Sequence, residues 1–502
     1  MERRIPNPKV RGSNPLRGTI RGIILFTIEG INDLKTLSDI IGGELFSNNE
    51  PFTGITVDSR EEVNGTVYLA LKGESFDGDN FCQDAIANGS IAVITDNPET
   101  LGRFILVKDT YDALLKIAGH HLKEINPRTI AITGSNGKTT VKEMMGTVLD
   151  SNKTIITKSN ENNQFGIPYT ILRCTSSTEN LVLECGARHD GDFQKIAEHF
   201  AFDQLVITNI NNSHVGIFGS IQNIIRTKLE LTKAVKKSGN VIEAAFKDLS
   251  KNHKLLKESS EIKLYDSNDL NFNTAWFYSC EKDSEQNDKY LISLNSENAD
   301  RQIKFEASIE HNCLNAVLAS LALEQFGYDI NESMKVLSGF KNPLMNRFHI
   351  HEISNYLVID DTYNANPTSM KSAMKTINDW KDERGRILIL GDMYDLGDHA
   401  SEEHKKVIKY ALEMNNLKKL ILVGDKFKNE SKDLNDKERE KVIQIENRVD
   451  DFPYLELTRE SSVKSKGIVH RYFKSQGGII LIKGSRAMKM ERFVTSVIKY
   501  IQ

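Results

Sequence analysis

The chain has 502 residues, and its length, composition and charge exclude several classes of protein. At about 100–200 residues per domain, this length predicts about three domains. Hydrophobic residues make up 39% of the chain and charged residues 27%, as is ordinary for a globular enzyme. The net charge of −4 gives no reason to expect nucleic acid or an anionic membrane as a partner. No apolar run approaches the roughly 20 residues that span a bilayer.

The first residues differ in composition from the rest. MERRIPNPKVRGSNPLRGTIRG carries six Arg/Lys against one acid, three prolines and no periodicity. The apolar patch IILF that follows is too short for the core of a signal peptide, and the segment lacks the Ser-rich, amphipathic character of a transit peptide. We therefore predict that residues 1–30 are a disordered or non-native extension, for example upstream translation from a wrong start assignment.

Three blocks follow along the chain. Residues 34–110 hold short strands and helices of a compact α/β unit. Residues 128–340 alternate strands (TIAIT, NLVLECG, QLVITNI) with helical patterns, which predicts a parallel sheet. Residues 345–502 begin another alternation with YLVIDD, RILILGD, LKKLILVGD and GGIILIKGS, whose Asp and Gly ends mark the ligand-binding edge of such a sheet. The hydrophilic stretch 425–450 is predicted to be a solvated helix face.

The cysteines carry no metal or disulfide motif. They are odd in number, scattered, and without C-x-x-C spacing: Cys82, Cys174, Cys185, Cys280 and Cys313. This pattern predicts reduced thiols in a cytosolic protein and argues against a disulfide framework or a structural zinc site.

The most informative segment is residues 130–140, IAITGSNGKTT. Ile130 and Ile132 predict a buried strand, the glycines allow a tight turn, and a helix is expected from Val141 to Leu149. N–H groups at such a helix start bind phosphate, a lysine there reaches the β- and γ-phosphates, and a hydroxyl coordinates Mg²⁺. We therefore predict that the loop binds ATP or GTP through Gly134, Ser135, Asn136, Gly137, Lys138, Thr139 and Thr140.

The spacing of this loop is shorter than the usual phosphate-loop pattern. Ile132 occupies the position of the usual first glycine, so the motif is G-x-x-G-K-T. A purely structural glycine turn is the alternative. The Lys-Thr-Thr run directly behind a strand favours phosphate binding.

Three residues of the central block are candidates for metal chemistry. Glu184 closes the strand NLVLECG, where a phosphate loop requires an acidic Mg²⁺ ligand, although a surface carboxylate is the alternative. His214 follows QLVITNI by a short polar loop and is either a metal ligand or a hydrogen-bonded structural histidine. Lys228 lies in the helical pattern RTKLELTKAV, and its spacing alone favours a solvated lysine.

A further helix is predicted after His311 and Asn312. Its apolar face comprises Leu314, Val317, Leu318 and Leu321. The His-Asn pair at its start is either a ligand contact or only a helix cap.

From about Leu34 to the C-terminus the motifs resemble the Mur ligases of bacterial cell-wall synthesis. TGSNGKTT matches the family's phosphate loop, and NENNQFGIP, LECGARHDGD, TNINNSHVGIFGS with RTKLEL, and HNCLNAVLAS follow in family order. The most discriminating motifs are DDTYNANPTSM at 360–370, LGDMYDLG at 390–397 and KGSRAMKMER at 483–492. Together these three look like the family member that adds D-alanyl-D-alanine.

The resemblance implies an α/β fold of three domains, with a central phosphate-loop parallel-sheet ATPase domain and a C-terminal Rossmann-like α/β domain. The implied boundaries are 31–125 for an N-terminal UDP-substrate domain, 126–342 for the ATP-binding domain and 343–502 for the ligase domain.

The resemblance also implies an ATP-dependent acid–amino-acid (peptide) ligase. In such enzymes the terminal carboxylate of UDP-N-acetylmuramoyl-tripeptide attacks the γ-phosphorus of ATP, giving an acyl phosphate and ADP. The amine of D-alanyl-D-alanine then displaces phosphate, in the final cytoplasmic step of peptidoglycan-precursor synthesis. We expect a monomer with no membrane or nucleic-acid partner.

Two Mg²⁺ ions follow from the same resemblance. Thr139 and Glu184 are expected at the first, and His214 and Lys228 at the second or at the acyl-phosphate pocket. The family's lysine is carbamylated by CO₂, which makes it a carboxylate-like ligand and overturns the solvated reading of Lys228. The implied catalytic residues are Lys138, His214 and Lys228.

The remaining contacts carry over position by position. The resemblance implies that Asn312, with its neighbour His311, contacts adenine. It also implies that the C-terminal domain contacts the nucleotide through Arg347, Asp361, Tyr363 and Asn364. The resemblance assigns substrate binding to Ser59, Arg60, Asn163, Lys483, Ser485 and Arg486.

The chain departs from the family pattern at three places. Asp79 stands where His is common, Asn346 stands where Gly is common, and EAAFKDL at 243–249 replaces an asparagine-aspartate stretch. These departures affect fine substrate contacts and the shape of the adenine pocket, but not the reaction class.

Two rival functions are considered. One is another Mur-type amide ligase, like folylpolyglutamate synthase, which would lack VDSR…DGDNF and DDTYNANP. The other is a phosphate-loop nucleotide switch, but a guanine-nucleotide switch needs an N-K-x-D base reader, and Asn152-Lys153 is not followed by the required Asp. The sequence leaves open whether the tripeptide ends in L-lysine or meso-diaminopimelate.

Overall fold

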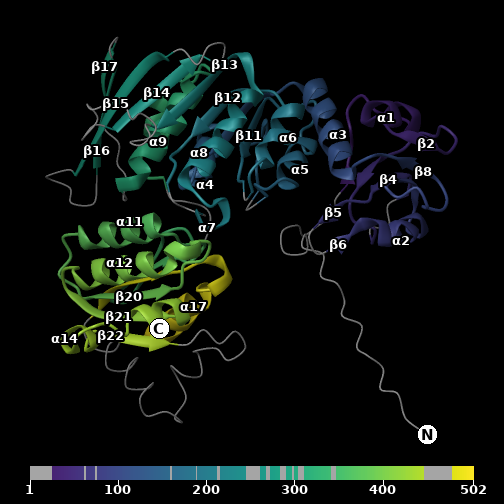
Figure 1. Ribbon diagram of the computed structural model, residues 1–502. Helices are drawn as coiled ribbons and strands as arrows, with labels where there is room; N and C mark the ends of the chain where they lie inside the picture. Colours follow the sequence, from purple (N-terminus) through teal and green to yellow (C-terminus); the bar gives the residue numbers. More distant parts are fainter. Residues whose placement is uncertain are drawn as a thin grey trace, which may run out of the picture.

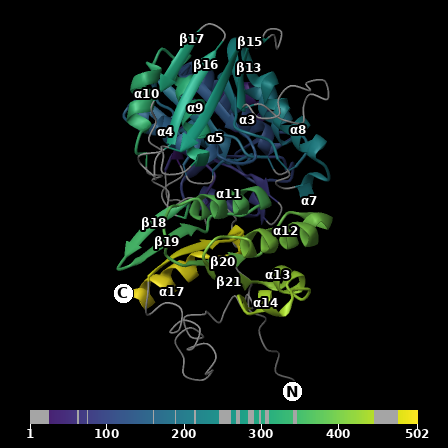
Figure 2. The ribbon, with the colours of Figure 1, turned by 90° about the vertical axis from the view of Figure 1, so that its left-hand side faces the viewer.

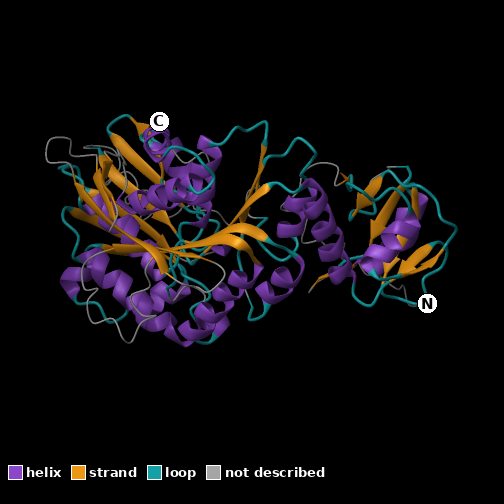
Figure 3. Cartoon of the chain, turned by 90° about the horizontal axis from the view of Figure 1, so that it is seen from above, coloured by secondary structure: helices purple, strands orange, loops and turns teal. Residues whose placement is uncertain are grey.

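The computed structural model consists of three α/β units, each built around its own sheet (Figure 1). The unit nearest the N-terminus stands to one side and joins the central unit through α3, while the C-terminal unit lies against another part of the central unit (Figures 1 and 3). The structure describes residues 25–60, 64–73, 76–158, 161–187, 189–211, 215–244, 260–266, 272–282, 290–296, 299–303, 310–340, 346–445 and 477–502.

The first sheet has the strand order β1-β3-β4-β7-β8-β2, with antiparallel edge strands on a parallel centre. Side chains of Asp33 and Asp109 cap its helices α1 and α3 by accepting hydrogen bonds from backbone N–H groups of the first turn. The elements are β1 (Leu25–Phe26), α1 (Leu34–Ile41), β2 (Glu44–Phe46), β3 (Gly54–Thr56), β4 (Thr66–Leu69), the hairpin β5 (Lys72–Gly73) and β6 (Phe76–Asp77), α2 (Cys82–Ala87), β7 (Ser90–Thr95), β8 (Phe104–Leu106) and α3 (Thr110–Ile125).

The first sheet corrects the predicted N-terminal extension. Residues 1–24 lie outside the described residues, but residues 25–30 belong to the fold. β1 pairs with β3, Phe26 and Ile28 are buried, and the backbone N–H of Glu29 donates to Nδ1 of His121 at 3.0 Å. The short apolar patch is therefore an edge strand, and assigning residues 25–30 to a disordered segment was wrong.

The central sheet places the strand before the phosphate loop between two neighbours. Strands β10, β11, β9, β12 and β13 are parallel in that order, so the carboxyl ends of β11, β9 and β12 lie side by side. Its elements are β9 (Arg128–Thr133), α4 (Lys138–Val148), β10 (Thr154–Ile156), α5 (Gly166–Leu172), β11 (Asn180–Glu184), α6 (Asp192–His199), β12 (Phe202–Ile207), α7 (Val215–Phe218), α8 (Ile221–Glu230), β13 (Val235–Ala244), α9 (Glu310–Glu324) and α10 (Ile330–Leu337).

An antiparallel extension continues this sheet beyond the predicted parallel part. β14 (Ser260–Asp266), β15 (Phe272–Lys282), β16 (Tyr290–Ser296) and β17 (Ala299–Ile303) pair in sequence after β13. The prediction of one parallel alternation over 128–340 was therefore wrong for these strands. The extension also joins Cys280 of β15 to Cys313 of α9 in a disulfide, which contradicts the prediction that all five thiols are reduced.

The two faces of the central strands enter different cores. Ile130 and Ile132 pack with α4 and α9, whereas Ala131 between them faces the core shared with α3 and α5. Helix α9 is apolar around most of its circumference because it is enclosed by α4, α10 and the sheet, as expected for a buried helix. It is described from Glu310 onward, so His311 and Asn312 lie in the first described turn of the helix.

The C-terminal sheet confirms the four predicted strands as parallel neighbours, with the order β18-β19-β23-β20-β21-β22 and β18 antiparallel at the edge. In the hydrophilic segment 425–450, the described residues 425–445 form two short helices and an edge strand rather than a single helix face. The elements are β18 (His349–Ile353), β19 (Tyr356–Asp361), α11 (Pro367–Asn378), β20 (Arg386–Gly391), η4 (Gly397–His399), α12 (Ala400–Leu412), β21 (Leu417–Val423), α13 (Asp425–Glu430), α14 (Asp436–Arg439), β22 (Val442–Ile445), β23 (Gly478–Lys483) and α17 (Glu491–Ile501).

The C-terminal unit presents α11 and the start of α12 towards the central unit, and α7 reaches down to meet it (Figures 1 and 2). Contacts between α7 and η4 join the two units. Within the described residues, no helix is both long and apolar enough to cross a membrane.

Candidate active site

The phosphate loop connects β9 to α4 at the centre of the sheet. The helix starts at Lys138, three residues earlier than predicted, and Gly137 at its N-cap has φ 85°. The N–H of Ser135 donates to the carbonyl of Asn209 at 2.8 Å, and the N–H of Asn136 donates to the side chain of Asn209 at 3.0 Å. These bonds to the loop after β12 fix the turn. The first N–H groups of α4 are left without intrahelical partners, which suits an anion.

Neighbouring side chains explain why both loop positions are glycine. A Cβ on Gly134 would collide with the hydroxyl of Thr208, and one on Gly137 would lie 2.5 Å from Oδ1 of Asn315. Both glycines also have positive φ. The loop is therefore approached closely by the segment after β12 on one side and by α9 on the other.

Two lysine ammonium groups converge on one carbonyl oxygen. Nζ of Lys138 donates to O of Gly134 at 2.7 Å, and Nζ of Lys228 from α8 donates to the same oxygen at 3.1 Å. Lys228 is only 6% exposed, so the solvated lysine that its spacing suggests is wrong. Among the described residues neither ammonium forms an ion pair with a carboxylate.

The electrostatics of these lysines follow from their surroundings. Burial lowers the pKa of Lys228 well below its ordinary value, and the charge of Lys138 lowers it further. Burial also lowers the pKa of Lys138, the carboxylate of Glu184 opposes that shift, and the charge of Arg347 adds to it. Burial and mutual repulsion therefore disfavour the protonated amine at both lysines, and a bound polyanion would favour it.

Glu184, at the end of β11, has one oxygen committed to protein and one available. Its Oε1 accepts from the hydroxyl of Thr139 at 2.9 Å and from the amide of Asn162 at 2.7 Å. Its Oε2 is buried and accepts no hydrogen bond from the described residues, although Nζ of Lys142 lies at 3.8 Å.

This oxygen and the adjacent hydroxyl fit the needs of Mg²⁺. Mg²⁺ is commonly held by one or two carboxylates, with waters and substrate phosphates completing an octahedron. No group of three or more His, Cys, Asp or Glu that could hold a metal occurs among the described residues. A single protein carboxylate beside a phosphate loop matches a metal that arrives with a nucleotide.

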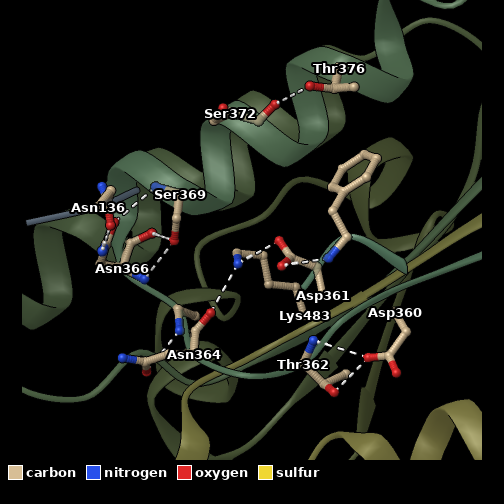
Figure 4. Close-up of polar contacts among 12 residues, drawn as sticks. Asn136, Asp360, Asp361, Thr362, Asn364, Asn366, Ser369, Ser372, Thr376 and Lys483 are labelled. Carbon is tan, nitrogen blue, oxygen red and sulfur yellow. Dashed lines mark hydrogen bonds and ion pairs between the residues drawn. The ribbon is translucent and has the colours of Figure 1, made fainter. Parts of the chain in front are cut away.

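The carboxyl edge of the C-terminal sheet carries a paired charge. Asp361 at the end of β19 stands in register with Lys483 at the end of β23. Nζ of Lys483 donates to Oδ2 of Asp361 at 2.6 Å and to O of Asn364 at 2.9 Å (Figure 4). The lysine is 2% exposed. It holds Asp361 and the following loop in place rather than presenting a free charge.

Aromatic stacking organises the arginines around Tyr363. The guanidinium of Arg347 lies 3.8 Å from the centre of the Tyr363 ring, and that of Arg486 lies at 6.0 Å. Nε of Arg347 is buried and has no acceptor among the described residues. Asn346, where the family commonly has Gly, has φ 70°, a conformation that Asn tolerates better than most residues.

A direct hydrogen bond joins the two edges. Asn366 caps α11 through a capping box with Ser369, and its Nδ2 donates to Oδ1 of Asn136 in the phosphate loop at 2.7 Å (Figure 4). The structure thus brings together the predicted residues of the phosphate loop, Lys228, Glu184, Arg347 and the loop 361–366, although they are up to about two hundred residues apart in sequence.

The predicted substrate residues are held locally. The carbonyl of Ser59 accepts from Asn88 at 2.7 Å, the guanidinium of Arg60 pairs with Asp58, and Oδ1 of Asn163 accepts from Gly166 N–H at 2.9 Å. Ser485 is buried, and its Oγ accepts from Tyr394 N–H at 2.9 Å.

Asp79, a departure from the family pattern, has partners of its own in the first unit. It accepts from Thr95 Oγ1 at 2.6 Å and pairs with Lys72 at 3.0 Å. The side chain that replaces the common histidine is therefore locally satisfied.

His214 lies outside the described residues, as do residues 245–249 of the EAAFKDL segment and the side chain of His311.

The sequence reasoning missed three amides that contact the site. Asn162 holds Glu184, Asn315 approaches Gly137, and Asn366 reaches the phosphate loop. Asn315 was within reach of sequence analysis, because it lies three residues after Asn312 and therefore on the same helix face.

Comparison with known families agrees with this geometry. The Mur ligase middle domain matches residues 132–323, the Mur ligase glutamate ligase domain matches 346–486, and the Mur ligase family catalytic domain matches 51–146. The chain belongs to the Mur ligase family. The three-domain α/β architecture expected from the sequence is confirmed.

Curated Mur ligase relatives cover nearly the whole chain. UDP-N-acetylmuramoyl-tripeptide–D-alanyl-D-alanine ligase of Bacillus subtilis is 31% identical over 93% of this chain and 98% of its own length. The enzyme of the same name from Haemophilus influenzae is 30% identical over 92% and 97%.

Solved Mur ligase structures share the fold. A crystal structure of MurF from Acinetobacter baumannii has a TM-score of 0.76 at 24% identity, covering 95% of this chain and 99% of that one. MurF ligase from Thermotoga maritima, solved in complex with ADP, has a TM-score of 0.70 at 21% identity, covering 89% and 97%.

Proposed function

We propose that this chain joins D-alanyl-D-alanine to UDP-N-acetylmuramoyl-tripeptide with conversion of ATP to ADP and phosphate, in the cytoplasm and as a monomer. The observation that carries the proposal is the pairing of a cation-rich phosphate loop with the loop 361–366 of the C-terminal unit. Relatives that carry this function by name align over almost the whole chain.

The first step needs two anions to meet. The tripeptide carboxylate attacks the γ-phosphorus of ATP, a carboxyl oxygen–phosphorus bond forms, and the bond to the ADP oxygen breaks. Lys138 and Arg347 supply positive charge at this position before the substrates arrive, because the charge of Arg347 acts on Lys138 beside the phosphate loop. Such preorganised charge stabilises the transition state without further reorganisation.

The second step needs an amine and a leaving phosphate. The amine of D-alanyl-D-alanine attacks the acyl carbon, the amide bond forms, the carbon–oxygen bond to phosphate breaks, and the amine loses a proton. We assign delivery of the dipeptide to the exposed side of the C-terminal edge, where Arg486 is 59% exposed in its side chain, rather than to the buried Lys483.

Thr139 and Oε2 of Glu184, which accepts no hydrogen bond from the described residues, would hold one Mg²⁺, which when bound neutralises charge on the phosphate oxygens. We assign a second Mg²⁺ to His214 and a carbamylated Lys228. Carbamylation joins the neutral amine to CO₂ with loss of one proton, and the lowered pKa of Lys228 favours that neutral amine. The remaining assignments, including Asn312 at adenine and Ser59, Arg60 and Asn163 at the UDP-substrate, stay proposals.

The experiment is a ligation assay read by mass spectrometry. Purified enzyme, ATP, Mg²⁺ and D-alanyl-D-alanine are incubated separately with the L-lysine and meso-diaminopimelate forms of the UDP-tripeptide. We expect the mass of the UDP-pentapeptide with one of them, only when ATP is present. Absence of product with both forms, from a folded enzyme, would contradict the proposal.

A further inference from the structure

Two glycines from different domains meet backbone to backbone, away from the phosphate loop. Gly216 lies in α7, and its N–H donates to the carbonyl of Asp395 at 3.0 Å. A Cβ on Gly216 would collide with the amide of Gly397 and lie 2.7 Å from the carbonyl carbon of Leu396. In the other direction, a Cβ on Gly397 would lie 2.8 Å from Cα of Gly216. Neither position has room for a side chain.

The backbone conformation of Gly216 does not require glycine. Gly216 is helical and its φ is not positive, in contrast to the φ of 51° at Gly397. A helical glycine is less stable than alanine at the same place. The contact across the domains is therefore the feature of this structure that accounts for glycine at position 216.

On the central side, packed side chains connect the contact to the helix of Lys228. Val215 and Phe218 of α7 form a buried cluster with Ile224 of α8. Helix α8 carries Lys228, whose ammonium reaches Gly134 of the phosphate loop. A displacement of α7 would be transmitted to this lysine through packed side chains.

On the C-terminal side, the contact is connected to the loop 361–366, whose Asn366 reaches the phosphate loop. The backbone N–H of Tyr394 donates to Oγ of Ser485 at 2.9 Å, and Ser485 in turn donates to O of Ala365 at 3.4 Å. Ala365 precedes Asn366, which contacts Asn136. The glycine contact and the Asn366–Asn136 bond thus join the domains on two sides of one site.

We propose that Gly216 and Gly397 form an interdomain docking seam, which the C-terminal domain must engage to hold Asn366 against the phosphate loop. Both glycines are positioning residues for ligation. The consequence for turnover rests on the proposed function, whereas the docking itself does not.

The test is Gly216→Ala, which adds only a Cβ and suits the helix, with Ile217→Ala as the matched control. Ile217 is the next residue of α7 and is 40% exposed. Docking is read without any activity, by oxidative trapping between cysteines introduced as Asn136→Cys and Asn366→Cys. The trapping is measured in the full chain with ATP and Mg²⁺.

We expect Gly216→Ala to reduce the rate of trapping at least fivefold and to leave the unfolding temperature unchanged or slightly raised. In the background without added cysteines, kcat for ligation should fall at least tenfold while binding of the UDP-tripeptide is retained. Ile217→Ala should match the parent in every measurement.

Unchanged trapping in folded Gly216→Ala would overturn the seam. If that variant does not fold, Gly397→Asn tests the same contact from the other side, since Asn tolerates positive φ. Normal trapping in the double-cysteine protein, combined with no amide from the enzyme without added cysteines, would contradict the proposed function and leave the seam standing.

Discussion

The carboxyl edges of the central and C-terminal sheets both carry buried lysines, but only at the C-terminal edge is the buried lysine paired with a carboxylate. At the central edge, Lys138 and Lys228 donate to a carbonyl and form no ion pair with a carboxylate among the described residues. At the C-terminal edge, Lys483 is neutralised by Asp361 at 2.6 Å. Burying a charge without an opposite charge costs free energy, so the central edge is arranged for an anion that the protein does not supply.

This difference separates binding residues from framework residues. An uncompensated buried cation identifies where phosphate is expected, and a paired one identifies the support behind the site. Lys483, assigned to substrate binding by resemblance, has the surroundings of a support for Asp361. The predictions below test this distinction, from the largest expected effect to the smallest.

The largest effect is expected at the phosphate loop. Lys138→Ala should lower kcat by about 10²–10³ or more, because it removes fixed positive charge from the γ-phosphate. The unfolding temperature should not fall, since the variant also removes a buried, unpaired charge. Lys153→Ala, at an exposed lysine of the same domain, should keep full activity. Near-normal kcat in folded Lys138→Ala would show that the loop is not catalytic.

Lys228→Ala should lower kcat by about 10²-fold, and a small added carboxylic acid should restore part of it, because a carboxylate supplies the anionic oxygens expected of a carbamate. Chloride should not restore activity. The control is Lys233→Ala, which removes an exposed lysine a little over one turn further on. Full activity of Lys228→Ala, and of the parent without bicarbonate, would contradict carbamylation.

Breaking the ion pair of Asp361 with Lys483 should lower the stability of the protein and also raise KM for ATP. Asp361→Ala should raise KM for ATP about tenfold by disordering the nucleotide side of the loop, and should lower the free energy of unfolding by about 3 kcal/mol by leaving Lys483 buried alone. Asp361→Asn, which can still accept the lysine hydrogen bond, should recover part of the stability. An unchanged KM for ATP would remove Asp361 from the nucleotide site.

The smallest effect is expected in the pH dependence of stability, through His404, which lies beside the segment that carries Gly397. The N–H of Met393 donates to Nε2 of the buried His404 at 3.0 Å, so protonating that nitrogen would break the bond. Burial lowers the pKa of His404 below the ordinary 6.5. The unfolded state therefore takes up the proton first as the pH falls. Stability should be full above pH 6.5 and decline below it, until the pH reaches the folded pKa.

The check is a series of denaturant titrations from pH 7.5 to pH 5. His404→Gln cannot titrate and should lose this part of the pH dependence. Identical slopes of stability against pH in the parent and in His404→Gln would contradict the assignment.

The local pattern predicted those parts of the site that lie on single elements. Alternating apolar residues identified β9, a glycine turn with Lys-Thr-Thr identified the start of α4, and the position of Glu184 at a strand end placed it beside that loop. The burial of Lys228 had no local signal, because the helix spacing of a solvated lysine and of one directed into a site is the same.

No local sequence pattern indicated the contacts between domains. Asn366 caps α11, but its amide also reaches Asn136, which is 230 residues away in the sequence. Gly216 sits in an ordinary helical stretch, and only the approach of Gly397 explains it. The pairing of Cys280 with Cys313 likewise depends on how β15 meets α9, which no spacing of cysteines indicates.

The most direct test of the account is phosphate release by the parent enzyme with ATP and Mg²⁺, measured with neither substrate, with each alone and with both. The central claim is that the cation-rich edge acts on ATP productively only with the tripeptide carboxylate and the dipeptide amine in place. We predict almost no release until both are present, and then one phosphate for each amide formed. Steady release of phosphate without them would contradict the ligase account and favour a nucleotide switch.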